Sequence, residues 1–413
     1  MRIKNFVLLM VAVYMGACIL MPPGGYDNDV DLFQSWAILV RKGGLSHAYD
    51  APAVDYNPLF LELLWLYGRI VGSLEGLSTS FFKFKMLVLL FDFGAVSLTA
   101  YMLRRNGRNI ALACFLLFNP AYLYITMIWG QVDSLLTVFV ALSIAFATRK
   151  KVLASFLCLV VAFNFKLIGV AFLPLVVLLN LPAIREDKKV LLRALPLLLA
   201  AQVLIFLPFL APHKLRTIVA ANQWHVNASP AIASSSGFNF WYFVFGEKTW
   251  EVSAARTFLH VSLKTWGRVL FAVSAAAVLV PLFKATILRK TPLSDAYVFL
   301  ASALYWLAFY CFTVGMHERY SQPVILLLGI YAVLSGNYFA YVLASIALFL
   351  NLAKTYQYFH FATYETQIFK NPFIGSLFLV VLIVGIVQIY RELKPAMRVA
   401  RADEDHGVLR AAS

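Results

Sequence analysis

Apolar runs long enough to cross a lipid bilayer recur along this chain and limit what it can fold into. The hydrocarbon core of a bilayer is about 30 Å thick, and a helix of about 20 apolar residues spans it. Hydrophobic residues make up 62% of the 413 residues, only 13% are charged, and the mean hydropathy is +0.78. Inside a bilayer the backbone of each run must satisfy its own hydrogen bonds. The sequence therefore predicts an all-α polytopic membrane protein.

We expect twelve transmembrane helices that form a single domain over residues 1–395, followed by a cytoplasmic tail at 396–413. The first apolar run is expected to be retained, because "MPPGG" after it is a poor signal-peptidase site. The expected spans are 5–21, 83–103, 110–127, 132–148, 152–164, 167–181, 190–210, 266–288, 294–313, 320–335, 338–352 and 373–390.

The positions of lysine and arginine in the loops predict how these helices are oriented. Basic clusters at 104–108, 149–151, 185–189 and 288–290 fall on one side of the predicted helices, together with both termini. Cytoplasmic loops carry an excess of lysine and arginine, so we assign that side to the cytoplasm. The net charge of +15 then lies largely where it sets topology and contacts anionic lipid. A nucleic-acid partner is not expected.

Two long loops are predicted on the outer side, at 23–82 and 211–265. The first contains two short segments, 31–41 and 57–72, whose length and apolar pattern predict helices that lie on or dip into the outer leaflet. Counting 57–72 as a full crossing would place the cluster "RRNGR" outside. The second loop is rich in aromatic and amide side chains, as in "NQWHVNASP" and "GFNFWYFVFG". The short loops favour a bacterial inner (plasma) membrane.

Three aspartates stand at alternate positions near the start of the first outer loop, at Asp27, Asp29 and Asp31. A carboxylate within hydrogen-bond reach of a hydroxyl can accept its proton, which makes Asp29 and Asp31 candidate general bases. Alternate acids can also bind a divalent cation, but too few further ligands are evident, and we expect no metal. A solvated acidic loop explains the same spacing without any catalytic role.

A second polar group stands in "GMHERY", where one predicted span ends and the next begins. It consists of His317, Glu318 and Arg319. Ionisable groups near hydrocarbon are costly and tend to be functional. The planar fork of arginine suits a phosphate group, and histidine adds a hydrogen-bond donor. An ordinary loop with a Glu318–Arg319 surface pair is the structural alternative.

Further polar residues are predicted on the same side of the membrane. "WGQVD" holds Gln131 and Asp133, and a carboxylate at Asp133 also favours the N-terminus of the next helix. "FNFKLIG" places Lys166 in a tight turn between two short helices. Asp92 lies inside a predicted span, and one interpretation is that it pairs with a basic neighbour.

The order and spacing of these motifs resemble the GT-C superfamily of integral membrane glycosyltransferases, which take sugar from a polyprenyl-phosphate carrier. "NDVDLFQSWAILVRKGG" resembles the first outer loop of these enzymes, where an acid–x–acid element before an interfacial helix holds the catalytic base. "DYNPLFLELLWLYG" is similar to the tyrosine- and proline-rich element that follows, with Asn57 where proline or threonine is frequent. The resemblance covers nearly the whole chain. An acceptor site in a soluble C-terminal domain, as in larger members, is not expected.

Three other motifs extend this resemblance. "WGQVDSLL", "GFNFWYFVFG" and "GMHERYSQPVILL" resemble motifs of bacterial relatives of the GPI mannosyltransferases and of polyprenyl-phosphate-dependent hexosyltransferases. The histidine–glutamate–basic element is similar to one that contacts the donor phosphate in glucosyltransferases of the endoplasmic reticulum. The resemblance implies a GT-C fold with interfacial helices in the first outer loop.

The resemblance implies an inverting glycosyltransferase that moves a hexose, mannose or glucose, from a polyprenyl-phosphate sugar in the outer leaflet to an extracytoplasmic acceptor hydroxyl. Asp29 is the preferred base because its spacing to Trp36 resembles that between the family's catalytic acid and its aromatic neighbour, with Asp31 as the alternative. The donor phosphate is expected near His317, Arg319, Lys166 and Arg69. The substrate is expected near Tyr56, Gln131, Asp133, Asn239, Trp241 and Glu318. The implied partners are the lipid-linked donor, a lipid- or glycan-linked acceptor and membrane lipids, without a cofactor.

A transporter or flippase of a lipid-linked glycan is the main alternative, and a non-enzymatic membrane subunit is another. A transporter places its ionisable groups near the bilayer midplane, in broken helices of paired halves, and no paired halves are evident in the sequence. A flippase needs charged groups along a path to both leaflets, whereas the polar segments above fall on one side. The subunit would not need a base together with phosphate-binding groups.

Overall fold

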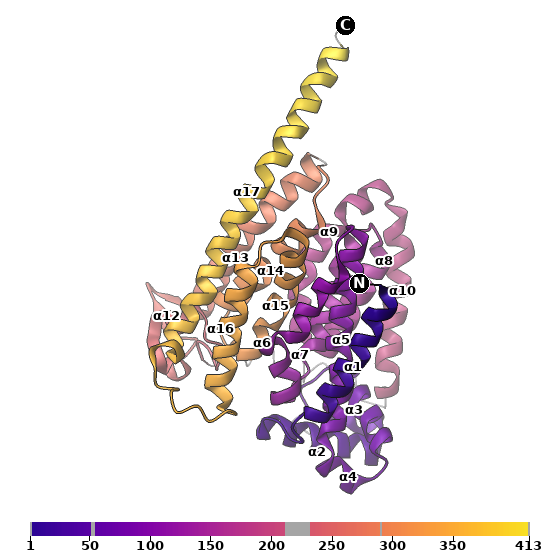
Figure 1. Cartoon of the computed structure of the whole chain (residues 1–413), viewed down its shortest axis with the longest axis vertical. Coiled ribbons are helices and arrows are strands. Elements are labelled where there is room, and N and C mark those ends of the chain that lie inside the picture. The colour runs from indigo at the N-terminus through magenta and orange to yellow at the C-terminus, as the bar shows by residue number, and fades with distance from the viewer. Residues whose placement is uncertain (1, 51–53, 211–231, 290, 412–413) are drawn as a thin grey trace.

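The computed structural model describes residues 2–50, 54–210, 232–289 and 291–411, with side chains as far as residue 393. This part of the chain is almost entirely helical (Figure 1), and its strands are β1 (Thr257–Phe258) and β2 (Val261–Ser262), which form an antiparallel hairpin. The helical elements are α1 (Ile3–Leu20), α2 (Asp27–Gly43), η1 (Leu45–Asp50), α3 (Pro58–Val71), α4 (Leu74–Thr79), α5 (Phe81–Arg105), η2 (Ile110–Phe118), α6 (Pro120–Leu123), η3 (Tyr124–Trp129), α7 (Asp133–Ala147), α8 (Val152–Phe165), η4 (Leu167–Phe172), α9 (Leu173–Glu186), α10 (Lys189–Phe206), η5 (Leu207–Phe209), α12 (Phe240–Phe245), η6 (Gly246–Glu251), α13 (Leu263–Phe283), η7 (Lys284–Leu288), α14 (Asp295–Phe312), η8 (Glu318–Ser321), α15 (Gln322–Ser335), α16 (Phe339–Tyr356), η9 (Gln367–Phe369) and α17 (Asn371–Ala411).

Eight helices in the described residues are long and apolar enough to cross a membrane, or nine if a bent pair at 110–129 is one span. This confirms the prediction of a polytopic helical membrane protein, with fewer long spans than the twelve expected. The other three expected spans are α7, α8 and α15, with 15, 14 and 14 residues. At about 1.5 Å per residue such helices fall short of the hydrocarbon thickness. Their apolar residues are explained by packing, because α7 and α15 are almost wholly buried among other helices.

The segment 110–129, expected as one span, is broken. Its two halves, η2 and α6 with η3, meet at an angle of 58°. Pro120 lacks the N–H that a continuous helix needs at this point, and the Asn119 side chain caps the second half by accepting a hydrogen bond from the Tyr122 N–H. The second half ends as a π-helix at Trp129, before Gly130 with φ of +86°. The break directs Trp129 towards the first turn of α2, where its carbonyl accepts a hydrogen bond from the Tyr26 N–H at 2.8 Å.

The first outer loop folds into a cap of short helices at one end of the bundle, hereafter the α2 end (Figure 1). The apolar face of α2 is buried against α3 through residues spaced three and four apart, including Phe33, Trp36 and Val40. α3 has 14 residues, in agreement with the prediction of a short helix at 57–72. The other expected helix, 31–41, is longer than predicted, since α2 begins at Asp27. The three aspartates therefore lie in its first turns and not in a loop before it.

The second outer loop is described from residue 232 onward. Residues 211–231, which include "NQWHVNASP", lie outside the described residues. The described part contains α12, η6 and the hairpin, and α13 begins at Leu263. At the other end of the chain, α17 continues as one helix to Ala411, so the expected tail at 396–413 prolongs the last helix as far as the description extends.

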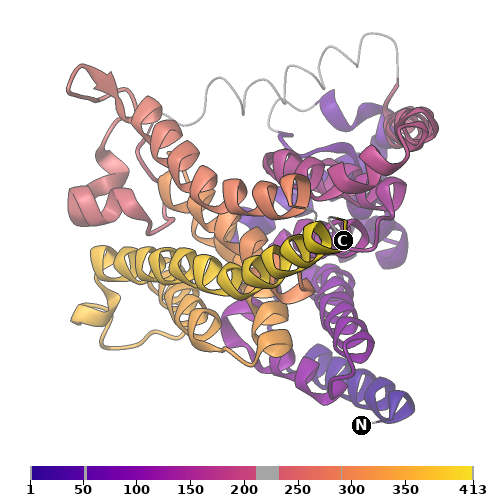
Figure 2. The same cartoon turned by 90° about the horizontal axis from the view of Figure 1, so that it is seen from above.

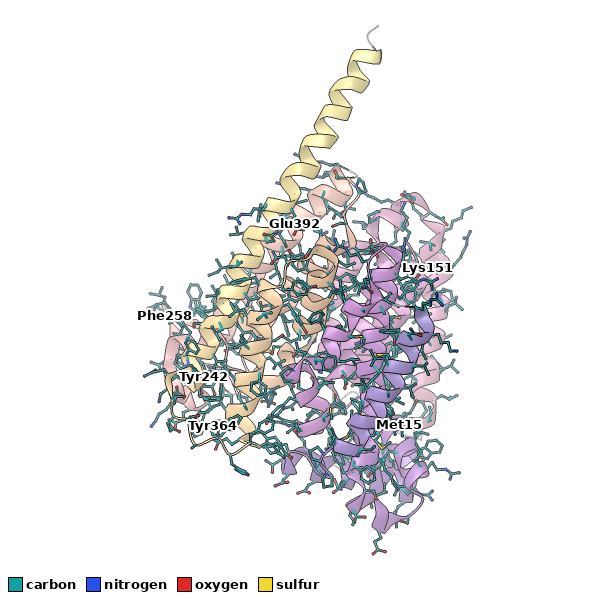
Figure 3. The ribbon with its side chains drawn as sticks, in the orientation of Figure 1. Met15, Lys151, Tyr242, Phe258, Tyr364 and Glu392 are labelled. Atoms are coloured by element: carbon teal, nitrogen blue, oxygen red, sulfur yellow. The ribbon has the colours of Figure 1, made fainter. Side chains whose placement is uncertain are left out.

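The two ends of the helix bundle are formed by different parts of the chain. α1 starts in the half of the bundle that lies away from the cap and runs towards the cap (Figure 1). Lys151 and Glu392 lie towards the end opposite to the cap, whereas Met15, Tyr242 and Tyr364 lie towards the α2 end (Figure 3). Seen from above, the two halves of the chain lie mostly on opposite sides of the bundle (Figure 2). The main core joins these halves through buried residues of α5, α7, α14, α15, α16 and α17.

Candidate functional site

Five segments that are far apart in the sequence meet at the α2 end. They are the first turn of α2, the residue pair before α3, the start of α7, the turn between α8 and η4, and the turn before α15. The site that they form is called the polar cluster below. Its members are Asp29, Tyr56, Gln131, Asp133, Lys166, His317, Glu318, Arg319 and Tyr320. Eight of these nine residues were predicted site residues, and the structure brings them together.

Asp133 is the central carboxylate of the polar cluster. It is the first residue of α7 and is 1% exposed. Its Oδ1 accepts a hydrogen bond from Lys166 Nζ at 2.7 Å, and its Oδ2 lies 3.7 Å from Arg319 Nε. The helix N-terminus also favours a negative charge here. Asp133 therefore both begins a helix, as its position in the sequence suggested, and contacts the two cations of the site.

Arg319 Nε is a buried donor with unfilled hydrogen-bonding capacity. Within the described part of the chain neither Arg319 Nε nor Asp133 Oδ2 has a hydrogen-bond partner, although the two atoms form an ion pair. Buried polar groups are nearly always hydrogen-bonded in proteins. An anionic oxygen placed between the helix ends could accept from this donor, which makes Arg319 the member of the cluster with the clearest capacity for a ligand.

Glu318 holds the other side of the Arg319 guanidinium. It is 1% exposed, accepts from Arg319 Nη1 and Ser236 Oγ, and lies 3.9 Å from His317 Nδ1. Burial by itself would raise the pKa of Glu318, but the charge of Arg319, with His317 and the Ser236 bond, lowers it to about 2. The Glu318–Arg319 pair expected as a structural alternative exists, but it is buried and not a surface pair.

Two tyrosine rings surround the ammonium group of Lys166. Lys166 Nζ lies 4.7 Å from the ring centre of Tyr320 and 5.8 Å from that of Tyr56, distances at which a cation is attracted to the ring face. Burial lowers the pKa of Lys166, and the carboxylate of Asp133 acts against this shift. The Tyr56 hydroxyl donates to Gln131 Oε1 at 3.4 Å. These contacts hold Lys166 inside the cluster.

Asp29 is oriented by an indole ring. It is the third residue of α2 and half-buried, and its Oδ2 accepts a hydrogen bond from Trp129 Nε1 at 2.7 Å. Its charge acts on Arg319, Lys166 and His317. Asp31 is exposed, and two residues apart on a helix two side chains point about 200° away from each other. Only Asp29 of these two acids therefore faces the cluster.

An aromatic wall stands beside Asp29. The rings of Tyr26, Trp129 and Tyr356 pack together, with centres 4.8 to 5.5 Å apart. Tyr356 is the last residue of α16, and its hydroxyl donates to the Gly25 carbonyl at 2.5 Å. Sequence reasoning did not single out Trp129, Tyr320, Tyr356 or Ser236 as site residues. Trp129 and Tyr320 stand in motifs that were noticed, whereas nothing in the sequence marks Tyr356 or Ser236.

Besides Asp31, three predicted site residues lie outside the polar cluster. Arg69 lies on the exposed face of α3, with its guanidinium carbon 5.7 Å from the Trp65 ring centre. Asn239 donates to the Tyr310 carbonyl and Trp241 Nε1 donates to the Phe312 carbonyl, each at 2.9 Å. These two bonds fasten α12 to α14 and give both residues a structural role.

Asp92 has no basic partner in the described residues, so the interpretation that it forms an ion pair is wrong. It is 1% exposed in the middle of α5, and neither carboxylate oxygen has a hydrogen-bond partner within that part of the chain. The hydroxyls of Thr126 and Ser134 lie nearby. Lys85, on the same helix, is occupied elsewhere, because its Nζ donates to the carbonyls of Pro22, Gly24 and Met127.

The charges of the polar cluster nearly balance. Three carboxylates (Asp29, Asp133 and Glu318) face two cations (Lys166 and Arg319), so the cluster has a formal net charge of −1. Burial and the charge of Arg319 lower the pKa of His317 to about 4, which keeps its ring neutral at pH 7. An incoming phosphate must therefore compete with resident carboxylates for the two cations.

The arrangement combines a half-buried carboxylate with buried cations in one site. Among the described residues no three His, Cys, Asp or Glu side chains gather closely enough to hold a metal ion. Proton transfer and stabilisation of an anion are the chemistry that these groups can perform. Comparison of the sequence with models of known protein families and with curated proteins gives no match, so the function is inferred from the site itself.

Proposed function

We propose that this protein is an inverting glycosyltransferase with its site on the extracytoplasmic side of the membrane, in a bacterial inner membrane. Its donor is a polyprenyl-phosphate hexose, and its acceptor is the hydroxyl of a lipid or glycan. One observation carries the proposal: the half-buried carboxylate of Asp29 stands in the same cluster as the buried cations Arg319 and Lys166. Such a site can activate a hydroxyl and stabilise a leaving phosphate.

The reaction is a single displacement at the anomeric carbon. The acceptor O–H gives its proton to Asp29, and the acceptor oxygen forms a bond to the anomeric carbon from the face opposite the phosphate. The bond between that carbon and the phosphate oxygen breaks, and the electron pair leaves with the polyprenyl phosphate. One displacement inverts the anomeric configuration. The bond from Trp129 to Asp29 Oδ2 leaves Oδ1 to receive the proton.

The leaving phosphate is assigned to Arg319, with Lys166 as a second cation. Arg319 Nε is buried without a hydrogen-bond acceptor in the described part of the chain and lies 3.7 Å from Asp133. A phosphate oxygen that accepts from Nε would occupy this unfilled position. Fixed, buried cations stabilise developing negative charge more strongly than water does, because they need no reorientation as the reaction proceeds.

A transporter or flippase of a lipid-linked glycan is a second candidate, and Asp92 is the observation that favours it. Ionisable residues inside a helix bundle often mark a transport path, and Asp92 is buried in α5 without an ionic partner among the described residues. The transferase is preferred because the acids and cations of the polar cluster lie together at one end of the bundle, whereas a flippase needs such charged groups along its whole path.

Purified protein incubated with a panel of polyprenyl-phosphate hexoses tests the proposal. We expect one donor to lose its sugar to an acceptor hydroxyl and to leave the polyprenyl phosphate as product. Reconstituted vesicles that translocate a lipid-linked glycan without cleaving any donor would replace this proposal with the transporter. Inverted anomeric configuration in the product, read by nuclear magnetic resonance, separates a single displacement from two.

A further inference from the structure

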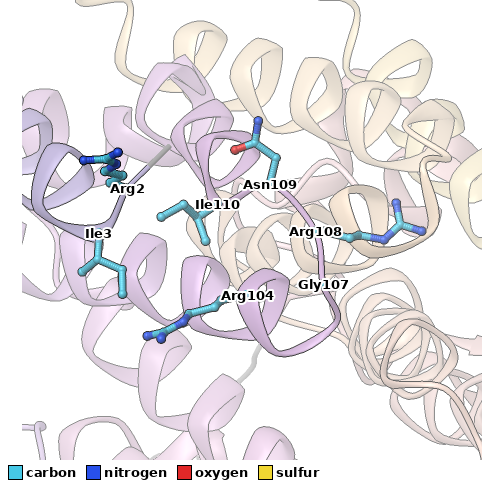
Figure 4. A pocket seen from close by; sticks show the side chains of 7 residues that line it. All are labelled: Arg2, Ile3, Arg104, Gly107, Arg108, Asn109 and Ile110. Atoms are coloured by element: carbon cyan, nitrogen blue, oxygen red, sulfur yellow. The ribbon is translucent and has the colours of Figure 1, made fainter.

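A basic pocket of about 540 Å³ lies where α1 begins (Figure 4), and the N-terminus lies away from the α2 end of the bundle (Figure 1). The start of α1, the last turn of α5 and the turn into η2 form its walls. α1 runs from this pocket towards the α2 end, and its 18 residues extend about 27 Å at 1.5 Å per residue. This length is close to the hydrocarbon thickness of a bilayer. The pocket therefore lies at the level of the other leaflet.

Three arginines line the pocket, Arg2, Arg104 and Arg108. None of them forms an ion pair within the described residues, and none of the residues that line the pocket is acidic. Asp295 contacts this turn through Asn106, which donates to its Oδ2 at 3.4 Å. The positive charge of Arg2 and Arg104 is therefore available to an anion, and Arg108 adds a further positive charge at the edge of the pocket.

The apolar side of the pocket continues into the face of a membrane helix. Figure 4 shows the side chains of Arg2 and Arg104 on either side of Ile3 and Ile110, with Arg108 extending in another direction. Ile3 is 48% exposed and begins an exposed apolar strip along α1 that includes Val7 and Val11, each four residues further on. A free phosphate ion has no apolar group that could pack on this strip, whereas the acyl chains of a phospholipid can.

We propose that this pocket binds the phosphate headgroup of an anionic phospholipid in the cytoplasmic leaflet, with the acyl chains along α1. Arginine matches a phosphate with two parallel hydrogen bonds. Basic pockets on the cytoplasmic side of membrane helices attract anionic lipid, and loop charges place these arginines on that side. This proposal does not depend on the proposed transferase activity, because it concerns a different part of the molecule.

The test measures the affinity of detergent-purified, full-length protein for three probes: short-chain phosphatidylglycerol, short-chain phosphatidylcholine and inorganic phosphate. Three variants accompany the wild type. The first replaces Arg2, Arg104 and Arg108 with Gln, and the second replaces them with Lys. The control carries Lys188→Gln, Lys189→Gln and Arg289→Gln, which remove the same charge from exposed residues outside the pocket.

We expect the wild type and the control to prefer phosphatidylglycerol over both other probes. Each basic residue near an anionic surface contributes about fivefold to affinity, so the Gln variant should lose more than about tenfold. The Lys variant keeps the charge that sets topology but loses the bidentate fork, so its affinity should fall between the two. The proposed site is contradicted if the Lys variant binds phosphatidylglycerol as tightly as the wild type and the control variant loses as much affinity as the Gln variant. Net charge alone would then explain the binding. If inorganic phosphate binds as tightly as phosphatidylglycerol, the proposal that the ligand is a phospholipid is contradicted.

Discussion

Trp129 Nε1 donates a hydrogen bond to Asp29 Oδ2 at 2.7 Å, across 100 positions of the sequence. The bond connects the end of the broken segment 110–129 to the first turn of α2. It holds one carboxylate oxygen of Asp29 in place. The break at Asn119–Pro120 and the start of α2 at Asp27 are thus linked in their effect, because both are needed to place Asp29 in the polar cluster.

Replacing Trp129 with Phe should lower turnover more than it lowers donor affinity. The ring remains in the wall with Tyr26 and Tyr356, but the bond to Asp29 is lost. A hydrogen bond to a charged group contributes about 1.5–3 kcal/mol, which corresponds to roughly a tenfold to hundredfold loss in kcat with little change in KM. Trp266→Phe is the matched control, since its indole donates to the Phe258 carbonyl and makes no contact with Asp29 among the bonds of the described residues. An unchanged kcat in Trp129→Phe contradicts the positioning role.

Replacing Arg319 should weaken binding of the donor. Arg319→Lys keeps the charge but loses the planar fork, and Arg319→Ala loses both, so affinity should fall in that order. Truncating one member of a buried charge pair costs about 2–5 kcal/mol, enough to weaken binding more than about tenfold. Arg69→Ala is the control and should bind normally, because Arg69 is exposed on α3 beside Trp65.

Affinities for a short-chain polyprenyl-phosphate hexose would be measured in these variants, with thermal unfolding to confirm that Arg319→Ala still folds. Glu318 loses its partner in that variant, so a lower Tm is expected. If all four proteins, the wild type included, bind the donor equally, the buried Glu318–Arg319 pair is structural only.

The pH dependence of stability and of donor affinity should be that of a protein in which His317 is neutral at pH 7. Burial and the charge of Arg319 lower its pKa from 6.5 to about 4 in the folded protein. Because the folded-state pKa lies below the unfolded value, the neutral ring contributes stability above about pH 6.5, and this contribution is lost as the pH falls towards 4. Donor affinity should accordingly have no histidine inflection between about pH 6 and 8. An inflection in that range that His317→Gln removes would contradict this assignment.

Lys166 and Asp133 should behave as a coupled pair in stability. Lys166→Met removes the hydrogen-bonded partner of a carboxylate that is 1% exposed, and breaking a buried pair costs about 3–5 kcal/mol. Asp133→Asn in turn leaves the buried ammonium without its counter-charge. The double variant should therefore lose less stability than the sum of the two single losses. Strictly additive shifts in Tm would show that the 2.7 Å bond does not stabilise the fold.

The helical membrane fold was predictable because long apolar runs are stable in a bilayer only as helices. The number of long spans was not, since a buried helix such as α7 or α15 is as apolar as a lipid-facing one and only its length and neighbours distinguish the two. The start of α2 was misplaced because polar residues at a helix N-terminus resemble a loop. Asp27 and Asp29 are acids in a first turn, where the helix dipole favours them.

The charged residues of the candidate site were predictable, because charged residues are rare in the apolar segments of this chain. Asp133, Lys166 and Arg319 were noticed for that reason, and they do meet. Arg69 carries the same charge but faces outward, and the direction of a side chain depends on the packing of its helix. Tyr56 and Gln131 are neutral and were predicted, whereas nothing in the sequence marked Tyr356 or Ser236. The placement of Tyr356 beside Trp129 follows from the fold of segments more than two hundred residues apart.

Single-turnover transfer from a polyprenyl-phosphate hexose, compared between wild type, Asp29→Asn and Asp31→Asn, tests the central proposal most directly. Asparagine keeps the size of the side chain and can still accept the Trp129 bond, but it cannot take a proton. A general base contributes about 100-fold or more, so Asp29→Asn should lose that much turnover and still bind the donor. Asp31→Asn, exposed on the other side of α2, should remain active. Turnover near the wild-type rate in Asp29→Asn would contradict the proposal.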